Sequence, residues 1–339
     1  MANVTLQTIA DEAKIDRGTV SRILSGKGRA AGISQGRIDR VQRIARDLKF
    51  RPNAGARSLR IKRHRQVGVL LHANSRRLHI AQFDTVMGFV EEMERFDYAV
   101  HVIRLSHTDD SDESPDLRIF REQMLDGVML LDSLDERITD KVEYAASSIV
   151  WVNHNRFDTT SCLRRDERAA GEVAATELHR LGYQRAIYID GKPQGIPHFS
   201  HQARREGFLN TAQRSGLAAS HETLPTSSTE DQPPDWLRQN DAETVLVAGT
   251  HYHARKLQSM LSYLGIRPGR DVGVACLDEV SETHSTWQTL ARVSFDRWQL
   301  GVQAATMLKQ AIDGHNAPPS ITISSSWHPG LSAPGPVVP

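Results

Sequence analysis

Cysteine is almost absent from this chain of 339 residues, which contains only Cys162 and Cys276. Neither belongs to a Cys-x-x-Cys pair or a Cys/His cluster, so the sequence offers no disulfide framework and no zinc-type ligand spacing. No run of about 18 apolar residues occurs, and no basic region followed by an apolar block opens the chain. These absences predict a chain without a membrane span or export signal, located in the cytoplasm.

Motifs of the common enzyme classes are also missing. No GxGxxG follows the first apolar run after residue 65, no P-loop is present, and no GxSxG or comparable nucleophile constellation occurs. We therefore expect no cofactor, and we predict that the chain is not an enzyme.

The chain lacks a large excess of either charge, since its formal net charge at pH 7 is +1. The charges are nevertheless divided: residues 1–62 hold 14 Lys and Arg against 5 Asp and Glu, whereas the remainder holds 28 against 36. A short basic block on an acidic body is typical of nucleic-acid binding, although tails and membrane-surface arms can share this bias.

The basic block has the periodicity of a small helical domain. Thr5 can cap a helix over residues 6–14, and Asp16 can cap a second helix with an inward apolar stripe. A third amphipathic helix is predicted over residues 34–48. Because only about two residues connect the first two helices, these must cross steeply, which predicts a helix-turn-helix.

The second helix should carry polar groups on its outer side. With its apolar stripe inward, Arg17, Gly18, Ser21 and Arg22 face outward and can enter a major groove. The guanidinium fork matches the O6 and N7 acceptors of guanine, so Arg17 and Arg22 are predicted base readers. The short hydroxyls of Thr19 and Ser21 suit phosphate oxygens. The alternative for each arginine is an ordinary solvated surface side chain.

The stretches "VTLQTIADEAKIDRGTVSRILSGK" and "RPNAGARSL" resemble the N-terminal domain of the LacI/GalR (lactose-repressor) family of bacterial transcription regulators. The resemblance implies that the second helix is a recognition helix and that residues 53–60 form a hinge helix, which folds on DNA. Leu59 would then be a minor-groove wedge, the alternative being a core leucine. The DNA-binding residues predicted in this way are Thr5, Arg17, Gly18, Thr19, Ser21, Arg22, Asn53, Ala56 and Leu59.

Two residues depart from the family pattern. Lys14 stands where the family usually has glycine, so we expect a left-handed backbone there at a cost of roughly 1 kcal/mol. Gly55 lies inside the expected hinge helix, where it costs up to about 1 kcal/mol relative to alanine.

After Arg65, short apolar runs alternate with amphipathic helical segments. The runs read as strands are "VGVLL", "YAVHVI", "GVMLL", "SIVWV", "AIYI", "TVLVA" and "VGVACL". Repeated βα units predict parallel sheets covered by helices, and a body of about 270 residues favours two sheets over one.

The resemblance extends to this body and implies an α/β periplasmic-binding-protein-like domain of two Rossmann-like subdomains with a ligand cleft between them. The fold class is thus a small all-α helix-turn-helix DNA-binding domain joined to such a domain. Crossovers are expected near Cys162, Leu290 and Ser324. The expected segments are a DNA-binding domain over 1–62, subdomains over about 66–162 plus 291–323 and 163–290 plus 324–330 within a body of 63–330, and an extended or disordered tail over 331–339.

In open α/β sheets, ligands bind beyond the carboxyl ends of the strands. By resemblance, "QARREGF" places an effector-binding arginine at Arg204, and "CLDEV" places a ligand-binding aspartate at Asp278. Asp166, in "RRDERAAG", is a third candidate. The alternative for all three is a structural role as a helix cap or ion pair. Gly249 and Thr250 stand where many relatives have an Asn-Asp pair that binds ligand or braces the cleft.

Other polar groups in the expected cleft loops are less specific. The pairs His251 and His253, and His198 and His201, lack a carboxylate or cysteine partner in sequence, so we read them as solvated surface residues and predict no metal site. Arg76 and Arg77 suit either an anionic effector or a solvated surface.

The predicted function is a sequence-specific transcription repressor. A homodimer would bind a pseudo-palindromic double-stranded DNA operator, with its affinity set by a small-molecule effector that is a sugar or sugar derivative. No membrane partner is expected, and a dimer is favoured because the tail lacks leucine-rich tetramerisation heptads. The alternative is a ligand-binding protein of the same fold without operator-specific regulation.

Overall fold

The computed structural model divides the chain into two compact units, Met1–His64 and Arg65–Pro339. The structure describes residues 4–51, 63–72, 80–105, 124–132, 136–191, 197–224, 232–278, 287 and 289–336. Each unit is considered by itself.

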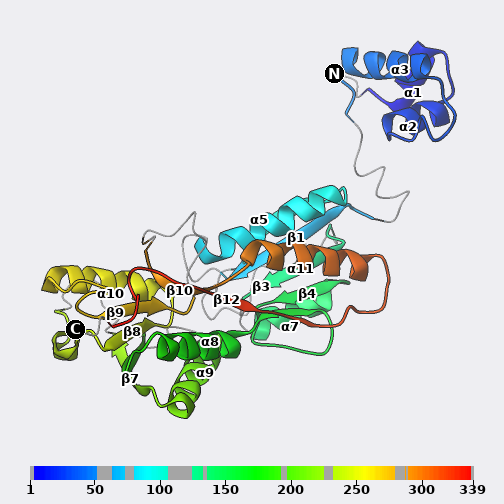
Figure 1. The fold of residues 1–339 in the computed structure, drawn as a ribbon. Helices are drawn as coiled ribbons and strands as arrows, with labels where there is room; N and C mark the ends of the chain where they lie inside the picture. Colours follow the sequence, from blue (N-terminus) through cyan, green and yellow to red (C-terminus); the bar gives the residue numbers. More distant parts are fainter. Residues whose placement is uncertain are drawn as a thin grey trace. The chain divides into compact units, whose positions relative to one another are not determined.

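The N-terminal unit is built from three short helices (Figure 1). They are α1 (Leu6–Ala13), α2 (Arg17–Leu24) and α3 (Gln35–Asp47). Their apolar stripes form one small core, in which Ile9, Val20, Ile23 and Val41 are buried. The three helices predicted from apolar periodicity are confirmed.

The turn between α1 and α2 depends on a left-handed lysine. Lys14 has φ 53° and ψ 46°, and its N–H donates to the carbonyl groups of Ala10 and Asp11. The conformation expected where the family has glycine is thus present, and these hydrogen bonds close the end of α1.

The second unit contains two sheets, each with six strands among the described residues. In spatial order, the first sheet consists of β11 (Ile321–Ile323), β5 (Cys162–Arg165), β4 (Ile149–Val152), β3 (Gly127–Leu131), β1 (Gln66–His72) and β2 (Ala99–Leu105). The second consists of β12 (Ser325–His328), β10 (Ala291–Phe295), β9 (Gly273–Cys276), β8 (Thr244–Ala248), β6 (Arg185–Gly191) and β7 (Ala218–Leu224).

Helices connect these strands and pack on the sheets (Figure 1). They are α5 (Ile80–Arg95), α7 (Glu136–Ala145), α8 (Glu167–Arg180), α9 (Phe199–Ser215), α10 (His251–Leu264) and α11 (Arg297–Ile312), with a 3-10 turn η1 (Asp235–Gln239). The strands are parallel except that β12 runs antiparallel to β10. The predicted two-sheet α/β architecture is confirmed.

Five strands were not predicted: β5, β7, β10, β11 and β12. Strand β7 forms one edge of the second sheet and is largely exposed, so it lacks the continuous apolar run of a buried parallel strand. Strand β5 carries two consecutive arginines, Arg164 and Arg165, which conceal it from a search for apolar runs.

The first two crossovers between the sheets come later than expected, whereas the third lies at Ser324, between β11 and β12, as predicted. Strand β5 pairs within the first sheet from Cys162 to Arg165, so the chain leaves this sheet after Arg165 rather than at Cys162. Strand β10 belongs to the second sheet as far as Phe295, so Ala291–Phe295 was assigned to the wrong subdomain. In both cases the strand finishes its pairing before the chain leaves for the other sheet.

The two crossovers exchange their helices. Helix α8 follows β5 of the first sheet and packs against β10 and β12 of the second, whereas α11 follows β10 and packs against β3 and β4 of the first. Both helices carry the pattern D-x-x-x-x-G-x-x-A-A-T-x-L, starting at Asp166 and at Asp296. Each of these aspartates accepts from the backbone N–H three residues later. The crossovers are therefore a pseudo-symmetric pair in sequence and in local structure.

The repeated glycine of this pattern brings a second helix into close contact. A Cβ on Gly171 of α8 would lie 2.2 Å from the Arg204 carbonyl oxygen of α9. A Cβ on Gly301 of α11 would lie 2.0 Å from the Thr85 carbonyl oxygen of α5. Each crossover helix can therefore pack backbone to backbone against its neighbour only because it has glycine there.

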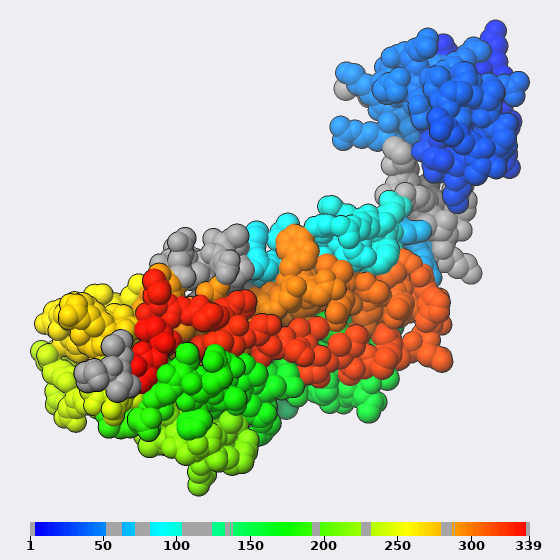
Figure 2. Space-filling model, viewed as in Figure 1, coloured from blue at the N-terminus to red at the C-terminus, as the bar shows by residue number. Residues whose placement is uncertain are grey.

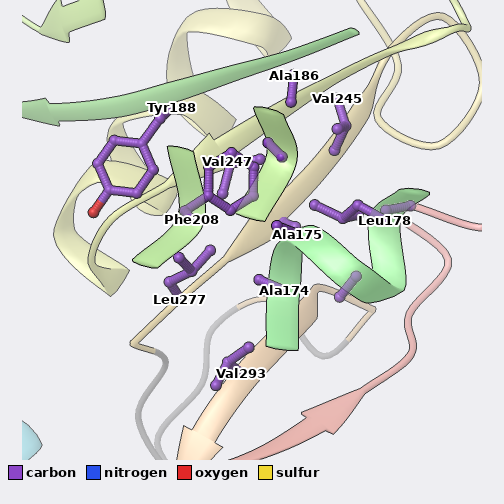
Figure 3. Close-up of a cluster of buried hydrophobic side chains, with 14 of the residues drawn as sticks. Ala174, Ala175, Leu178, Ala186, Tyr188, Phe208, Val245, Val247, Leu277 and Val293 are labelled. Carbon is purple, nitrogen blue, oxygen red and sulfur yellow. The ribbon is translucent and has the colours of Figure 1, made fainter. Parts of the chain in front are cut away.

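The alanines of α8 face the core of the second sheet (Figure 3). Ala174, Ala175 and Leu178 point toward Val245 and Val247 of β8, and all are buried. Small side chains let the helix approach the sheet closely, which fixes the position of the first turn of α8 relative to the strand ends.

Part of the C-terminal segment is anchored in the second sheet. The Ser332 hydroxyl donates to the Val274 carbonyl oxygen at 2.7 Å and accepts from the Ala291 N–H at 2.8 Å. Ala333 is buried beside it. The expected tail is therefore not disordered at these residues, and Figure 2 shows the C-terminal segment (red) beside α8 (green).

Candidate DNA-binding and effector sites

The outward face of α2 is the candidate DNA-reading surface. Arg17, Gly18 and Arg22 are exposed, while Val20 and Ile23 of the same helix are buried. The predicted orientation of the two arginines is thus confirmed, and their role as base readers stays a prediction.

Two other predicted DNA-binding residues, Thr19 and Thr5, form hydrogen bonds inside the N-terminal unit. Asp16 caps α2, accepting from the Thr19 N–H at 2.8 Å, and the Thr19 hydroxyl donates to the same carboxylate. The hydroxyl bond from Thr19 holds the pKa of Asp16 below its ordinary value. Thr5 caps α1 through a reciprocal pair with Thr8. Because its hydroxyl proton is donated to Asp16, the Thr19 side chain has no donor left for a phosphate oxygen while this cap persists.

Some predicted residues lie outside the part of the chain that the structure describes. These are Asn53, Ala56 and Leu59 of the expected hinge helix, with Gly55, and Arg76 and Arg77 of the first expected cleft loop.

In the second unit, the carboxyl ends of both sheets meet around a buried ion network. Arg204 of α9 and Glu167 of α8 are each 1% exposed, and Asp278, which follows β9, is 8% exposed. Arg204 Nη2 lies 2.6 Å from Glu167 Oε2 and 3.3 Å from Asp278 Oδ2. The two strongest effector candidates, Arg204 and Asp278, are thus brought together, but as partners of each other.

Arg204 has little capacity left for a ligand. Its Nε also donates to Glu167 Oε2, at 2.9 Å, and its Nη1 donates to the Gly249 carbonyl oxygen. Burial opposes its charge, but the adjacent carboxylates of Glu167 and Asp278 outweigh burial and raise the pKa of Arg204.

Two further arginines complete the network. Arg165, at the end of β5, lies 2.9 Å from Asp278 Oδ1 and 2.7 Å from Glu167 Oε1. Arg297, the first residue of α11, pairs with the same oxygen of Asp278. Burial disfavours the charge of Asp278, but Arg165, Arg297 and Arg204 hold the pKa of Asp278 well below its usual range.

This network joins the two sheets. Arg165 ends a strand of the first sheet, whereas Asp278 follows a strand of the second. A second connection links His198 Nε2 to the Asn153 carbonyl oxygen at 2.7 Å, and the Phe199 N–H donates to Asn155 Oδ1 at 2.9 Å. Breaking a buried ion pair by removing one partner typically costs about 3–5 kcal/mol, so the network strongly restrains this junction.

Asp166 is not part of the network. Its carboxylate caps α8 by accepting from the Ala169 N–H at 2.9 Å. The contacts of Asp166 thus agree with the structural role considered above, that of a helix cap. Its neighbour Glu167 supplies a carboxylate to the ion network.

The histidines differ from expectation. His251 and His253 lie in the first turn of α10 rather than in a loop, and His253 is buried rather than solvated. Burial lowers the pKa of His253 to about 4, and burial together with the neighbouring His198 lowers that of His154 to about 4. Within the described residues no group of three or more His, Cys, Asp or Glu side chains could hold a metal ion.

Sequence reasoning missed Glu167, Arg165 and Arg297. The signal that could have found two of them is the repeated pattern of the crossover helices, in which Glu167 and Arg297 occupy the same position directly after the capping aspartate. The two residues at this repeated position have opposite charges. Arg297 pairs with Asp278, and Glu167 pairs with Arg165 and Arg204, which also contact Asp278.

Comparison with known proteins agrees with this architecture. A family model described as a periplasmic binding protein-like domain matches residues 175–332. The ribose operon repressor of Haemophilus influenzae is 22% identical over 92% of this chain and 93% of its own length. The regulator AscG of Escherichia coli is 21% identical over 94% of this chain and 95% of its own. The chain is therefore similar, over nearly its whole length, to proteins named as transcription regulators.

Solved structures of transcription regulators have the same fold as this chain. The lac repressor dimer bound to operator and the anti-inducer ONPF has a TM-score of 0.76 at 17% identity, covering 98% of this chain and 99% of that one. The transcriptional regulator CelR in complex with cellobiose has a TM-score of 0.60 at 18% identity, covering 97% and 100%. In the part of this chain that the structure describes, no helix is long and apolar enough to cross a membrane.

Proposed function

We propose that this chain is a LacI/GalR-type transcription repressor that binds a pseudo-palindromic operator as a homodimer and responds to a sugar-like effector. The observation that carries the proposal is the folded, basic helix-turn-helix unit, whose second helix exposes Arg17 and Arg22 away from its core. Relatives over the whole length are named operon repressors, including the ribose operon repressors of two bacteria.

The effector would act at the carboxyl edge of the two sheets. Ligands of α/β sheets bind at this edge. The ion network there pairs residues of the two sheets, so a change in their relative position would disturb it. A ligand that prefers one arrangement shifts operator affinity by linkage. We place the protein in the cytoplasm and assign it no enzymatic activity, since the relatives are named regulators rather than enzymes.

The alternative is a ligand-binding protein of the same fold without operator-specific regulation. This alternative does not explain why the N-terminal unit, in which α1 and α2 are both capped, exposes arginines on α2. Operator selection separates these two functions.

The test is selection of full-length protein on a randomised double-stranded DNA library, followed by affinity measurements at 50 and 200 mM salt. We expect an enriched pseudo-palindrome and an affinity that falls roughly a thousandfold or more over this range, as for proteins that neutralise about six or more phosphates. Equal affinity for random DNA, or no symmetric sequence among the selected sites, would refute the proposal.

Arg22→Ala tests the recognition surface itself. We expect loss of preference at one base pair per half-site, worth about 1–3 kcal/mol, because a bidentate contact to guanine is removed. Arg180→Ala, an exposed arginine at the end of α8, is the matched control and should leave the preference unchanged. An Arg22→Ala protein that selects the same sequence with the same affinity would remove Arg22 from the readout.

A further inference from the structure

Four carboxylates at the carboxyl edge are paired with groups inside the protein. Glu167 and Asp278 belong to the arginine network, in which each of their oxygens contacts a guanidinium group. Asp132, directly after β3, accepts from Asn153 Nδ2 at 3.0 Å through one oxygen and from Gln82 through the other.

Asp190, near the end of β6, is used in the same way. One of its oxygens lies 2.9 Å from Arg205 Nη1, and the other lies 2.9 Å from His221 Nε2. Each of these four carboxylates is therefore engaged inside the protein, and the one buried oxygen among them without a hydrogen bond, Glu167 Oε1, lies 2.7 Å from the Arg165 guanidinium group.

The loop after β8 adds no further carboxylate. The carbonyl oxygen of Gly249 accepts from Arg204, and the hydroxyl of Thr250 caps α10 by accepting from the His253 N–H. These two residues replace the Asn-Asp pair expected from the family resemblance, so the side-chain acceptors of that pair are missing here.

Arg297 has the opposite property, since it is a donor with unused capacity. It is 7% exposed, and its Nη2 pairs with Asp278. Its buried Nε has no hydrogen-bond partner among the residues that the structure describes. Burial and the nearby Arg165 both lower the pKa of Arg297, so its charge is incompletely compensated. A buried donor left unsatisfied is destabilising, more so when it is charged, and is a candidate ligand contact.

We infer that the effector carries a carboxylate or phosphate group and that Arg297 donates to it. The inference rests on the proposed function and specifies the ligand class of the same site. A neutral polyol brings hydroxyl groups that donate as well as accept, and the side-chain carboxylates that usually accept from them are engaged here. An oxyanion only accepts, so it satisfies Arg297 without displacing an internal ion pair.

The test is a thermal-shift comparison on the full-length protein with matched pairs of compounds. The pairs are D-glucose with D-glucuronate, D-ribose with D-ribose 5-phosphate, and D-fructose with D-fructose 1-phosphate, each at millimolar concentration. We expect at least one acid to raise the melting temperature while its neutral parent does not, since only a ligand that binds the folded state stabilises it. The carboxylate and phosphate pairs distinguish the two sources of the anionic group.

Variants of Arg297 locate the contact. For the acid that shifts the wild type, Arg297→Gln should raise Kd about ten- to hundredfold, the range expected for a hydrogen bond to a charged group. Arg297→Lys keeps the charge beside Asp278 but lacks the Nε donor, so it should bind the acid with intermediate affinity even if the glutamine variant folds poorly. Arg180→Gln is the control and should bind like the wild type.

The inference would be overturned if the neutral parents raised the melting temperature of the wild type as much as the acids do. It would also be overturned if both Arg297 variants bound the acid with the affinity of the wild type. Operator selection is scored separately on the same protein preparations. Specific operator binding together with a response to neutral sugars alone would reject the acidic effector and leave the repressor function standing, whereas sequence-blind DNA binding would reject the function itself.

Discussion

At the scale of single residues, His253 is a neutral group among charged ones. It is buried at the start of α10, facing Asp190 of β6, His201 and Arg204 of α9, and His251 of its own helix. Burial lowers its pKa to about 4, from 6.5 in an unfolded chain, so below pH 6.5 the unfolded state binds the proton more readily. The stability linked to His253 is therefore present above pH 6.5 and lost as the pH falls toward 4.

His253→Gln should consequently flatten the acid side of the stability profile. At pH 5 the wild type should have lost about 2 kcal/mol relative to pH 7.5 through this residue alone, and the variant should not show this part of the loss. The measurement is the melting temperature between pH 4.5 and 7.5. His179→Gln, at an exposed position on α8, is the control; a His253 variant with the same pH profile as the wild type would contradict the prediction.

The residue scale is also where the sequence was least informative. Family resemblance correctly brought Arg204 and Asp278 to one place, because both follow motifs at fixed strand ends. It could not show that Glu167, Arg165 and Arg297 meet them, since the network depends on the pairing of Arg165 with Asp278, 113 residues apart and from different sheets. Charged side chains are mostly exposed, so sequence alone gives no reason to bury three arginines together.

At the scale of elements, the two crossover helices depend on one glycine each. Gly171→Ala and Gly301→Ala each place a Cβ within 2.2 Å of a backbone carbonyl oxygen of the facing helix. Because backbone cannot yield as a flexible side chain can, each helix pair must separate, at a cost of about 1–3 kcal/mol or more. This exceeds the gain of up to about 1 kcal/mol from replacing glycine by alanine inside a helix.

We expect both variants to melt several degrees below the wild type, and to a similar extent because the two crossovers are pseudo-symmetric. Gly36→Ala on α3 is the control, since a Cβ there would meet no heavy atom of the described chain within 4 Å. It should leave stability unchanged or improve it slightly. Stabilisation by either crossover substitution would show that the helix contacts are looser than the structure indicates.

The helices and buried strands were the features of this structure that the sequence predicted best. The helices of the N-terminal unit follow from apolar periodicity and from caps such as Thr5 and Asp16, which are local signals. The buried parallel strands follow from continuous apolar runs. Strands β7 and β12 could not be recognised in this way, since they lie at sheet edges and their pairing partners, not their own composition, define them.

At the scale of the whole molecule, DNA-reading and ligand-sensing groups occupy different units of the chain. The candidate base readers lie within Met1–His64, and the ion network lies within Arg65–Pro339. An effector at the network therefore cannot compete with DNA for the same side chains. Its influence on the operator must be a coupling free energy between two sites, which is reciprocal by thermodynamic necessity.

This reciprocity gives a quantitative prediction for the full-length dimer. If an acidic effector changes operator affinity by some factor, saturating operator must change effector affinity by the same factor; coupling of this kind is typically about 5- to 150-fold. Four titrations close the cycle: operator binding with and without effector, and effector binding with and without operator.

Asp278→Asn removes the negative charge shared by three arginines, so it should reduce the coupling factor more than it reduces operator affinity alone. Effector binding that leaves operator affinity unchanged in the wild type would show that the ion network does not transmit between the units.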